Sequence, residues 1–362
     1  MGDNMNKGTE NYIFQYLRWR GDLSFEQDRF NEIDAFIFSQ LTYYDYSGIV
    51  GKEKLKLKTA LKVYYDRNHS RGFKLGLIFP DHMVELGKLI MKTKRYEDIY
   101  ISDYVDKYDR LKKEQFTGVT FHLNDNLLVV SYKGTDDTLI GWEENFNMII
   151  SFPVAAQVSA KEYMDDIAES YPKAHYYLTG HSKGGNLAMY AGFYVNPLIQ
   201  NKIVRIYNFD GPGFESDDID QEKYLRIKNK IKTVVPVNSI IGMIFEPLGN
   251  LKAVKSPVKP VYQHDGFMWE IECNRFARTP ISKSSSQFSI DLNKLVGQLN
   301  EEERRSFCNS LEKYIDELGI KTLTEALSLK TKSIKALKVF TKKDREIFFN
   351  FVKILIKNGV IR

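Results

Sequence analysis

One short segment of the chain combines a serine with the glycines that a strained catalytic turn needs. Gly180-His-Ser182-Lys-Gly184 has the spacing G-x-S-x-G, between an apolar strand-like run and a helix-like run rich in small residues. In this context the pattern predicts a sharp strand-to-helix turn that lifts the serine hydroxyl above a sheet, where bulky neighbours would collide. We therefore predict that Ser182 is a nucleophile, with an ordinary glycine-rich turn as the alternative.

A serine nucleophile needs a base, and the histidines offer one candidate. Where such a serine stands on a sharp turn from a strand to a helix, the chain order of the three groups is Ser, then Asp or Glu, then His. Of the six histidines only His264 follows Ser182, and it lies beyond the strand-like residues 251–255. We predict that His264 accepts the Ser182 proton and returns it to the leaving group, with a surface loop histidine as the alternative. His181, next to the serine, is predicted to have a packing or structural role rather than to react.

Asp210 is the first candidate for the acid that orients His264. It follows the strand-like residues 203–209 and begins an Asp-Gly-Pro-Gly turn, and functional groups collect at such carboxyl ends of parallel strands. Asn238 has the rival position after the next strand, but an amide could orient His264 without stabilising an imidazolium by charge. Two further carboxylates are weaker alternatives: Asp217 and Asp265.

The negative charge that develops in acyl transfer needs N–H donors, and two positions can supply them. Lys183 follows the predicted nucleophile at the start of a helix, and Thr135 follows Gly134 in a turn at the end of the strand-like residues 127–132. We predict that Thr135 and Lys183 form an oxyanion hole. Trp142 is predicted to pack in the core, with a place in the pocket wall as the alternative.

These side chains need a sheet to position them, and the pattern of the chain predicts one. Residues 118–123 and 127–132 read as a hairpin, and strand-like and helix-like segments then alternate to about residue 255. This alternation predicts an α/β fold with a mostly parallel, α/β-hydrolase-like sheet and helices on both faces. Residues 1–115 read as largely helical, most clearly over 28–41 and 81–91.

The C-terminal part of the chain has a different character. We predict a hydrolase-type domain over residues 1–286 and a helical appendage over 287–362. Helix starts are marked by pairs with capping-box spacing or by a lone threonine: Asn300 with Glu303, Thr322 with Glu325, and Thr341. The net charge of the chain is +5, and the excess lies beyond residue 280, which predicts a solvated basic surface or weak contact with an anionic membrane.

Composition excludes several classes of protein. Apolar residues make up 43% and charged residues 27%, which is ordinary for a globular chain. The two cysteines are far apart, so neither a disulfide framework nor a cysteine metal site is expected. We find no secretory signal and no bilayer-length apolar run, and expect a cytoplasmic protein. No metal cluster, phosphate-binding loop or dinucleotide fingerprint is present, so we predict no cofactor, and no nucleic-acid partner is expected.

The same motifs resemble those of known lipases. Tyr132-Lys-Gly-Thr135 and Gly180-His-Ser-Lys-Gly184 are similar to the Phe-Arg-Gly-Thr and Gly-His-Ser-Leu-Gly motifs of class 3 (fungal-type) lipases. A closer resemblance, over roughly residues 10–270, is to a family of lipase-like α/β hydrolases (Mbeg-like) from low-GC Gram-positive bacteria. Its matching segments are Phe30–Asp34 with Ser39–Tyr43, Gly134–Asp137 with Gly141-Trp142, Asn208–Gly213, Ser239–Met243 and Gln263–Asp265.

The resemblance implies Ser182 as nucleophile, His264 as base, and Thr135 with Lys183 at the oxyanion hole. Class 3 lipases carry their acid near a Val-Pro step, which here reads Thr233-Val-Val-Pro236 without a carboxylate. That departure favours Asp210 as the acid. We predict a serine hydrolase that acts on a small-molecule or lipid carboxylic ester, and the alternative is a catalytically idle fold that serves as a binding or membrane-associated module.

Overall fold

The protein is described by a computed structural model that covers residues 11–69, 80–109, 111–135, 148, 151–317 and 337–359. Within these residues, nine strands form one sheet: β1 Leu55–Lys56, β2 Tyr100–Asp109, β3 Glu114–Asn124, β4 Leu127–Tyr132, β5 His175–His181, β6 Ile203–Phe209, β7 Ile231–Pro236, β8 Asn250–Val254 and β11 Arg278–Thr279. A separate two-stranded ribbon pairs β9 Ile271–Glu272 with β10 Arg275–Phe276.

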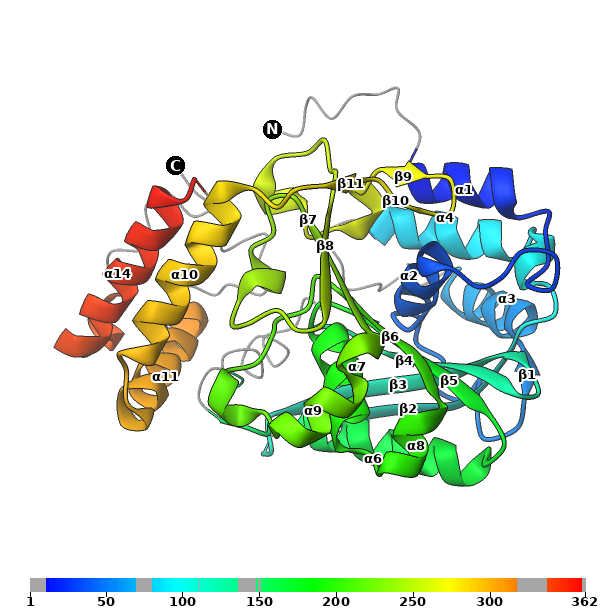
Figure 1. Ribbon diagram of the computed structural model, residues 1–362, viewed down its shortest axis with the longest axis horizontal. Helices are drawn as coiled ribbons and strands as arrows, with labels where there is room; N and C mark the ends of the chain where they lie inside the picture. The colour runs from blue at the N-terminus through cyan, green and yellow to red at the C-terminus, as the bar shows by residue number, and fades with distance from the viewer. Residues whose placement is uncertain are drawn as a thin grey trace.

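The strands lie in the order β1-β2-β3-β4-β5-β6-β7-β8-β11 (Figure 1). β4 to β8 are parallel, and this is the part of the sheet that carries the candidate site. β1 to β4 pair antiparallel, as does β11 with β8, so the sheet is mixed around a parallel centre. The architecture is α/β and α/β-hydrolase-like, as the alternating pattern of the sequence predicts.

The α-helices of the described residues fall into three groups. The N-terminal group is α1 Tyr12–Arg20, α2 Glu32–Leu41, α3 Leu57–Asn68 and α4 Pro80–Ile90. The central group is α6 Ala155–Ser170, α7 Lys183–Tyr194, α8 Pro197–Lys202 and α9 Gln221–Ile227. The C-terminal group is α10 Lys283–Gly297, α11 Glu301–Glu317 and α14 Lys342–Lys357.

The two faces of the sheet carry two separate apolar cores because strand side chains alternate between faces. On β4, Leu128 and Val130 point into the core beneath α6 and α7, while Val129 points into the core that includes α2. Helix α2 is buried along its whole length, and its backbone is tied to the sheet at the carbonyl of Ala35, which accepts a 2.9 Å hydrogen bond from Thr179 Oγ1. Helices therefore cover both faces, as predicted.

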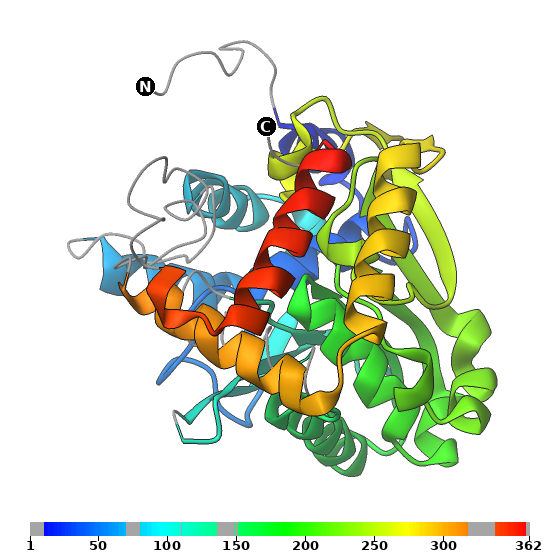
Figure 2. The same cartoon turned by 90° about the vertical axis from the view of Figure 1, so that its left-hand side faces the viewer.

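The C-terminal helices lie at the opposite side of the molecule from α1 to α4 (Figure 1). Figure 2 shows α10 and α14 side by side, with α11 crossing beside them. Asn300 and Glu303 form the reciprocal capping bonds predicted from their spacing, and Thr341 caps α14. The predicted helix start at Thr322 lies outside the described residues, and the division of the chain at residue 286 remains a prediction.

Two predictions of local structure differ from the structure. The helix predicted over 28–41 begins at Glu32, because Asn31 caps it and pairs with Asp34 in a capping box. The largely helical segment 1–115 also contains β2, whose charged and half-exposed sequence lacks a clear strand pattern. No helix in the described ranges combines the length and the apolar character needed to cross a bilayer.

Candidate active site

Ser182 lies on the turn between β5 and α7, at the carboxyl end of the central strand. Its backbone has φ 56° and ψ −133°, a strained conformation for a residue with a side chain. A hydrogen bond holds this conformation: the Ser182 N–H donates to the carbonyl of Phe209, 2.8 Å away on the neighbouring strand. The side chain therefore projects from a fixed turn at the N-terminus of a helix, and the residue is 9% exposed.

The glycines around Ser182 are required by packing. A Cβ on Gly180 would lie 2.1 Å from the carbonyl oxygen of Gly184, and one on Gly184 would lie 2.1 Å from the carbonyl oxygen of Tyr132. Real Cβ atoms do not approach backbone so closely, so larger residues would force α7 away from β4 and β5. The G-x-S-x-G spacing is thus the consequence of a helix that begins in direct contact with two strands.

His264 lies between two short 3-10 helices, η5 Pro260–Tyr262 and η6 Gly266–Met268, beyond the last parallel strand. Its Nδ1 is 2.7 Å from Oδ2 of Asp210, whose side chain is 1% exposed, whereas the His264 side chain is 23% exposed. A buried carboxylate at Nδ1 favours the tautomer that donates from Nδ1, which leaves Nε2 as the acceptor. The imidazole is therefore held in the orientation that a general base requires.

The turn that begins at Asp210 has an unusual backbone conformation, and several hydrogen bonds hold it in place. The residue has φ 49°, and its N–H donates to the carbonyl of Val234 at 2.8 Å. The Asn208 amide spans the turn, since its oxygen accepts from the Gly211 N–H at 2.9 Å. Asn186 of α7 donates to the carbonyl of Pro212 at 3.1 Å. Neither asparagine was predicted to support the site, because these contacts are with backbone atoms of the turn.

The other candidate acids lie elsewhere. The Asn238 N–H donates to Oε1 of Gln263 at 3.0 Å, while the Nδ1 position of His264 is taken by Asp210. Asp265 accepts from the Phe267 N–H at 3.0 Å, and Asp217 lies exposed in η2 Ser216–Asp218. Of the carboxylates considered from the sequence, Asp210 is the one in hydrogen-bond reach of His264.

His181 contributes to the site through a backbone contact. Its Nε2 is 2.8 Å from the carbonyl oxygen of His264, and the two rings lie 4.7 Å apart between centroids. Burial, together with the nearby His264, lowers the pKa of His181 to about 3. The ring is therefore neutral at ordinary pH, and its Nε2–H donates to the loop that carries His264. This contact falls within the packing or structural role predicted for His181, although its partner, 83 residues away in the chain, could not be read from the sequence.

The two predicted oxyanion positions flank the same turn. A Cβ on Gly134 would lie 2.5 Å from the carbonyl oxygen of His181 and 3.2 Å from Cβ of Ser182, so the Gly134-Thr135 turn lies against the serine. Lys183 is the first residue of α7, where backbone N–H groups point out of the helix end. Its side chain is buried, and Nζ donates to the carbonyl of Gln115 at 2.8 Å. Trp142 lies outside the described residues.

No group of three or more His, Cys, Asp or Glu side chains gathers among the described residues in a way that could hold a metal ion. Cys273 is exposed and Cys308 is buried, and neither forms a disulfide. The arrangement that can do chemistry is thus the serine turn with the paired His264 and Asp210.

The fold is that of an α/β-hydrolase-like protein, with Ser182, His264 and Asp210 at the carboxyl end of its parallel strands. The chain belongs to the Mbeg1-like family, whose model matches residues 90–313, well over half of its length. No curated protein sequence matches the chain.

Three solved lipases are similar in structure. The Lip2 lipase of Yarrowia lipolytica is 13% identical over 52% of this chain and 73% of its own, with a TM-score of 0.33. Lipase II of Rhizopus niveus is 16% identical over 62% and 80%, with a TM-score of 0.32. The lipase of Rhizopus microsporus var. chinensis is 14% identical over 71% and 83%, with a TM-score of 0.35.

Proposed function

We propose that this protein is a serine hydrolase that cleaves a carboxylic ester through an acyl-enzyme. The observation that carries the proposal is the 2.7 Å contact between His264 Nδ1 and the buried Asp210 carboxylate, beside the strained turn of Ser182. Burial shields the Asp210 carboxylate from water, so it both orients the imidazole and stabilises the imidazolium that forms during attack.

In the first half of the reaction, Ser182 Oγ attacks the ester carbonyl while His264 Nε2 takes its proton. The carbonyl oxygen becomes an oxyanion, which accepts hydrogen bonds from the backbone N–H of Lys183 and from Thr135. Collapse of the tetrahedral intermediate breaks the C–O bond of the ester. The alcohol leaves with the proton that His264 returns, and the acyl group remains on Ser182.

In the second half, water takes the place of the alcohol. His264 removes a proton from the water as it attacks the acyl carbon, and the same donors stabilise the second oxyanion. Release of the carboxylic acid returns the proton to Ser182 and regenerates the enzyme. Apart from the substrate and water, every group that acts in this cycle belongs to the chain, so the proposed reaction needs no cofactor.

The substrate class follows from the site and from the relatives. A serine, an imidazole and a buried carboxylate are suited to acyl transfer from esters and thioesters. The structurally similar proteins are named as lipases, which supports an ester of a lipid or of another acylated small molecule.

Labelling with a fluorophosphonate probe tests the proposal, since such probes modify an activated serine and leave an unactivated one intact. The wild type, Ser182→Ala and His264→Ala are compared as purified, folded proteins. We expect the wild type to label and both variants to lose labelling. A folded wild type that never labels would favour the alternative of an idle hydrolase fold that binds a ligand.

We propose in addition a weak contact between the C-terminal helices and anionic membranes. Ile290 of α10 and Ile356 of α14 are 61% and 53% exposed, and they flank an ion pair that joins the helices, with Lys357 Nζ 2.8 Å from Asp291 Oδ2. Phe349 on α14 is 48% exposed. These apolar side chains share their helices with exposed cations: Lys283, Lys294, Lys342, Lys343, Arg345 and Lys353.

In α10 and α14, which are described throughout, Glu346 is the one exposed acid, so the surface favours anionic lipid. We expect the full chain to float with phosphatidylglycerol-containing vesicles at low salt and to dissociate as salt rises. The double variant Ile290→Glu, Ile356→Glu should lose this binding, whereas Leu198→Glu, at an exposed apolar position of α8, should keep it. Absence of wild-type binding would leave the helices with a structural role alone.

A further inference from the structure

The second oxygen of the Asp210 carboxylate is held as firmly as the first. While Oδ2 faces His264, Oδ1 accepts hydrogen bonds from Ser239 Oγ at 2.5 Å and from the Gly242 N–H at 3.1 Å. Ser239 is 2% exposed. Both donors come from the segment after β7, so this segment determines how the carboxylate is turned toward the imidazole.

The same segment is held from outside by the first turn of α10. Ser285 Oγ donates to the carbonyl of Ser239 at 2.5 Å, and the Ser282 N–H donates to the carbonyl of Val237 at 2.9 Å. A continuous chain of hydrogen bonds therefore leads from the C-terminal helices to His264. It passes through the backbone and side chain of one residue, Ser239, and then through Asp210.

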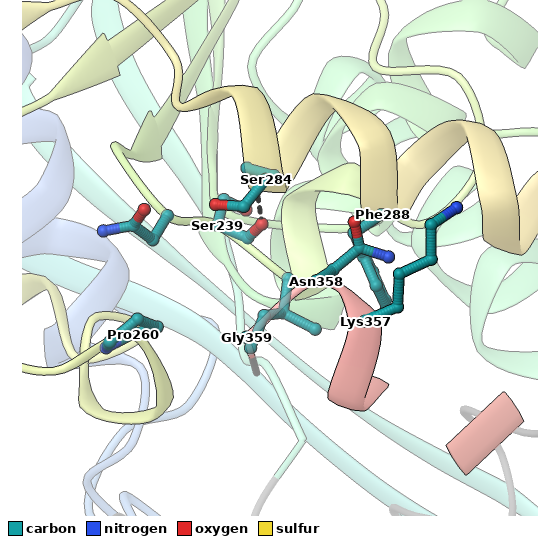
Figure 3. A pocket seen from close by; sticks show the side chains of 10 residues that line it. Ser239, Pro260, Ser284, Phe288, Lys357, Asn358 and Gly359 are labelled. Carbon is teal, nitrogen blue, oxygen red and sulfur yellow. Dashed lines mark hydrogen bonds between the residues drawn. The ribbon is translucent and has the colours of Figure 1, made fainter. Parts of the chain in front are cut away.

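A cavity of about 320 Å³ borders this chain of hydrogen bonds, and Figure 3 shows Ser239, Ser284 and Phe288 among the side chains that line it. Side chains that line a cavity lack packing partners on that side. Ser239 therefore has open space on one side, and its hydrogen bonds with Asp210 and Ser285 help to hold it in place. If one of these bonds is lost, the segment after β7 can shift into the space that the cavity provides.

We propose that Ser239 is a positioning residue for the acid of the active site, and that the first turn of α10 supports it. The C-terminal helices are then part of the catalytic unit, because their docking determines the orientation of Asp210. Without the Ser239 hydroxyl, Oδ1 keeps the Gly242 N–H as its donor, and the carboxylate can rotate out of line with His264. The inference rests on the proposed function, since it assigns Ser239 a role in the same hydrolase site.

The test compares the rate of fluorophosphonate labelling among serine variants. Ser239→Ala should lower the rate by tenfold or more, as expected for loss of a hydrogen bond to a charged group. Ser285 contacts Ser239 and not Asp210, so Ser285→Ala should lower the labelling rate by a smaller factor. Ser284→Ala is the matched control, because it lies on the same turn and cavity, and it should label like the wild type. In an Asp210→Asn background, Ser239→Ala should have no further effect.

Two results would overturn the inference. One is a Ser239→Ala protein that labels at the wild-type rate. The other is an equal loss from Ser239→Ala in the wild-type and Asp210→Asn backgrounds, since a purely structural role would not depend on the acid. Melting temperatures of all variants identify any that are unfolded, and Ser285→Ala tests the same chain of bonds if Ser239→Ala does not fold.

A second readout needs no activity. The Nδ1 proton of His264, shared with a buried carboxylate, should give a proton NMR signal downfield of the amides in the wild type and in Ser284→Ala. The signal should broaden or vanish in Ser239→Ala as the carboxylate turns away. If the wild type does not label but the NMR signals differ among the variants as described, the proposed hydrolase activity is wrong and the positioning role of Ser239 still holds. An unchanged signal in Ser239→Ala would sink the positioning role by itself.

Discussion

His181 Nε2 lies 2.8 Å from the carbonyl oxygen of His264, so the residue before the serine holds the loop of the histidine. The ring also packs edge-on against Phe36, with centroids 6.0 Å apart. His181→Phe keeps the aromatic packing and removes the donor. We expect fluorophosphonate labelling to slow by about tenfold, the effect of one buried hydrogen bond. His175→Phe, at an exposed position of the same strand, should label like the wild type, and equal rates for all three proteins would refute this role.

Buried histidines make stability dependent on pH. Burial lowers the pKa of His122 to about 4 and that of His181 to about 3, both below the unfolded value of about 6.5. The unfolded chain therefore binds more protons below pH 6.5, so stability is lost as the pH falls from there toward the folded-state values. Each group should contribute a loss of about 1 kcal/mol in the free energy of unfolding at pH 5.5.

Urea unfolding at pH 7.5 and 5.5 measures this dependence. His122→Asn removes one of the two groups and should reduce the loss between the two pH values by about 1 kcal/mol. His175→Asn, at an exposed position, should leave the loss unchanged. If His122→Asn shows the full wild-type loss, then His122 titrates normally and the effect of its burial is wrongly assigned.

A buried ion pair joins α2 to the short 3-10 helix η1 Lys94–Tyr96, which precedes β2. Asp34 of α2 accepts two bonds from Arg95, from Nε at 2.8 Å and from Nη2 at 2.6 Å, and both side chains are fully buried. Arg95→Met leaves a buried carboxylate without its cation and should lower the free energy of unfolding by about 3–5 kcal/mol. Lys56→Met breaks an exposed 3.4 Å pair with Asp98 and should have little effect. Similar urea midpoints for both variants would contradict this difference.

The glycines of the serine turn should not tolerate a methyl group. Gly184→Ala would place Cβ against the Tyr132 carbonyl, so α7 must shift. We expect a loss of about 1–3 kcal/mol in unfolding free energy and at least a tenfold slower labelling rate. Gly297→Ala is the matched control, because a Cβ there meets nothing within 4 Å. Equal stability and labelling of the two variants would show that the turn is less constrained than its contacts indicate.

The parts of the fold that could be predicted from the sequence are those with strong local patterns. β6 and β8 are short runs next to turn residues, and the strands predicted over 203–209 and 251–255 agree with them to within one residue. β2 reads Tyr-Ile-Ser-Asp-Tyr-Val-Asp-Lys-Tyr-Asp and is half-exposed beside an antiparallel neighbour, so it lacks both the apolar run and the strict alternation that identify strands.

In the site, too, the residues that could be predicted are those marked by nearby sequence, and those that could not depend on contacts between distant parts of the chain. Ser182 and His264 follow from a local spacing and from chain order. Asp210 stayed one of several candidates because its contact joins residues 54 apart in the chain. Ser239 and His181 act through a carboxylate oxygen and a backbone carbonyl that only the folded chain brings to them, and no side-chain spacing encodes such contacts.

The central claim is that Asp210 is the acid that makes His264 a base for Ser182. The rate of fluorophosphonate labelling of Asp210→Asn tests it most directly, with Asp265→Asn, next to His264 in the chain, as the matched control. We expect Asp210→Asn to slow labelling by about a hundredfold or more, because an amide cannot stabilise the imidazolium, while Asp265→Asn stays near the wild-type rate. Wild-type labelling by Asp210→Asn, or loss of labelling in Asp265→Asn alone, would contradict the proposed site.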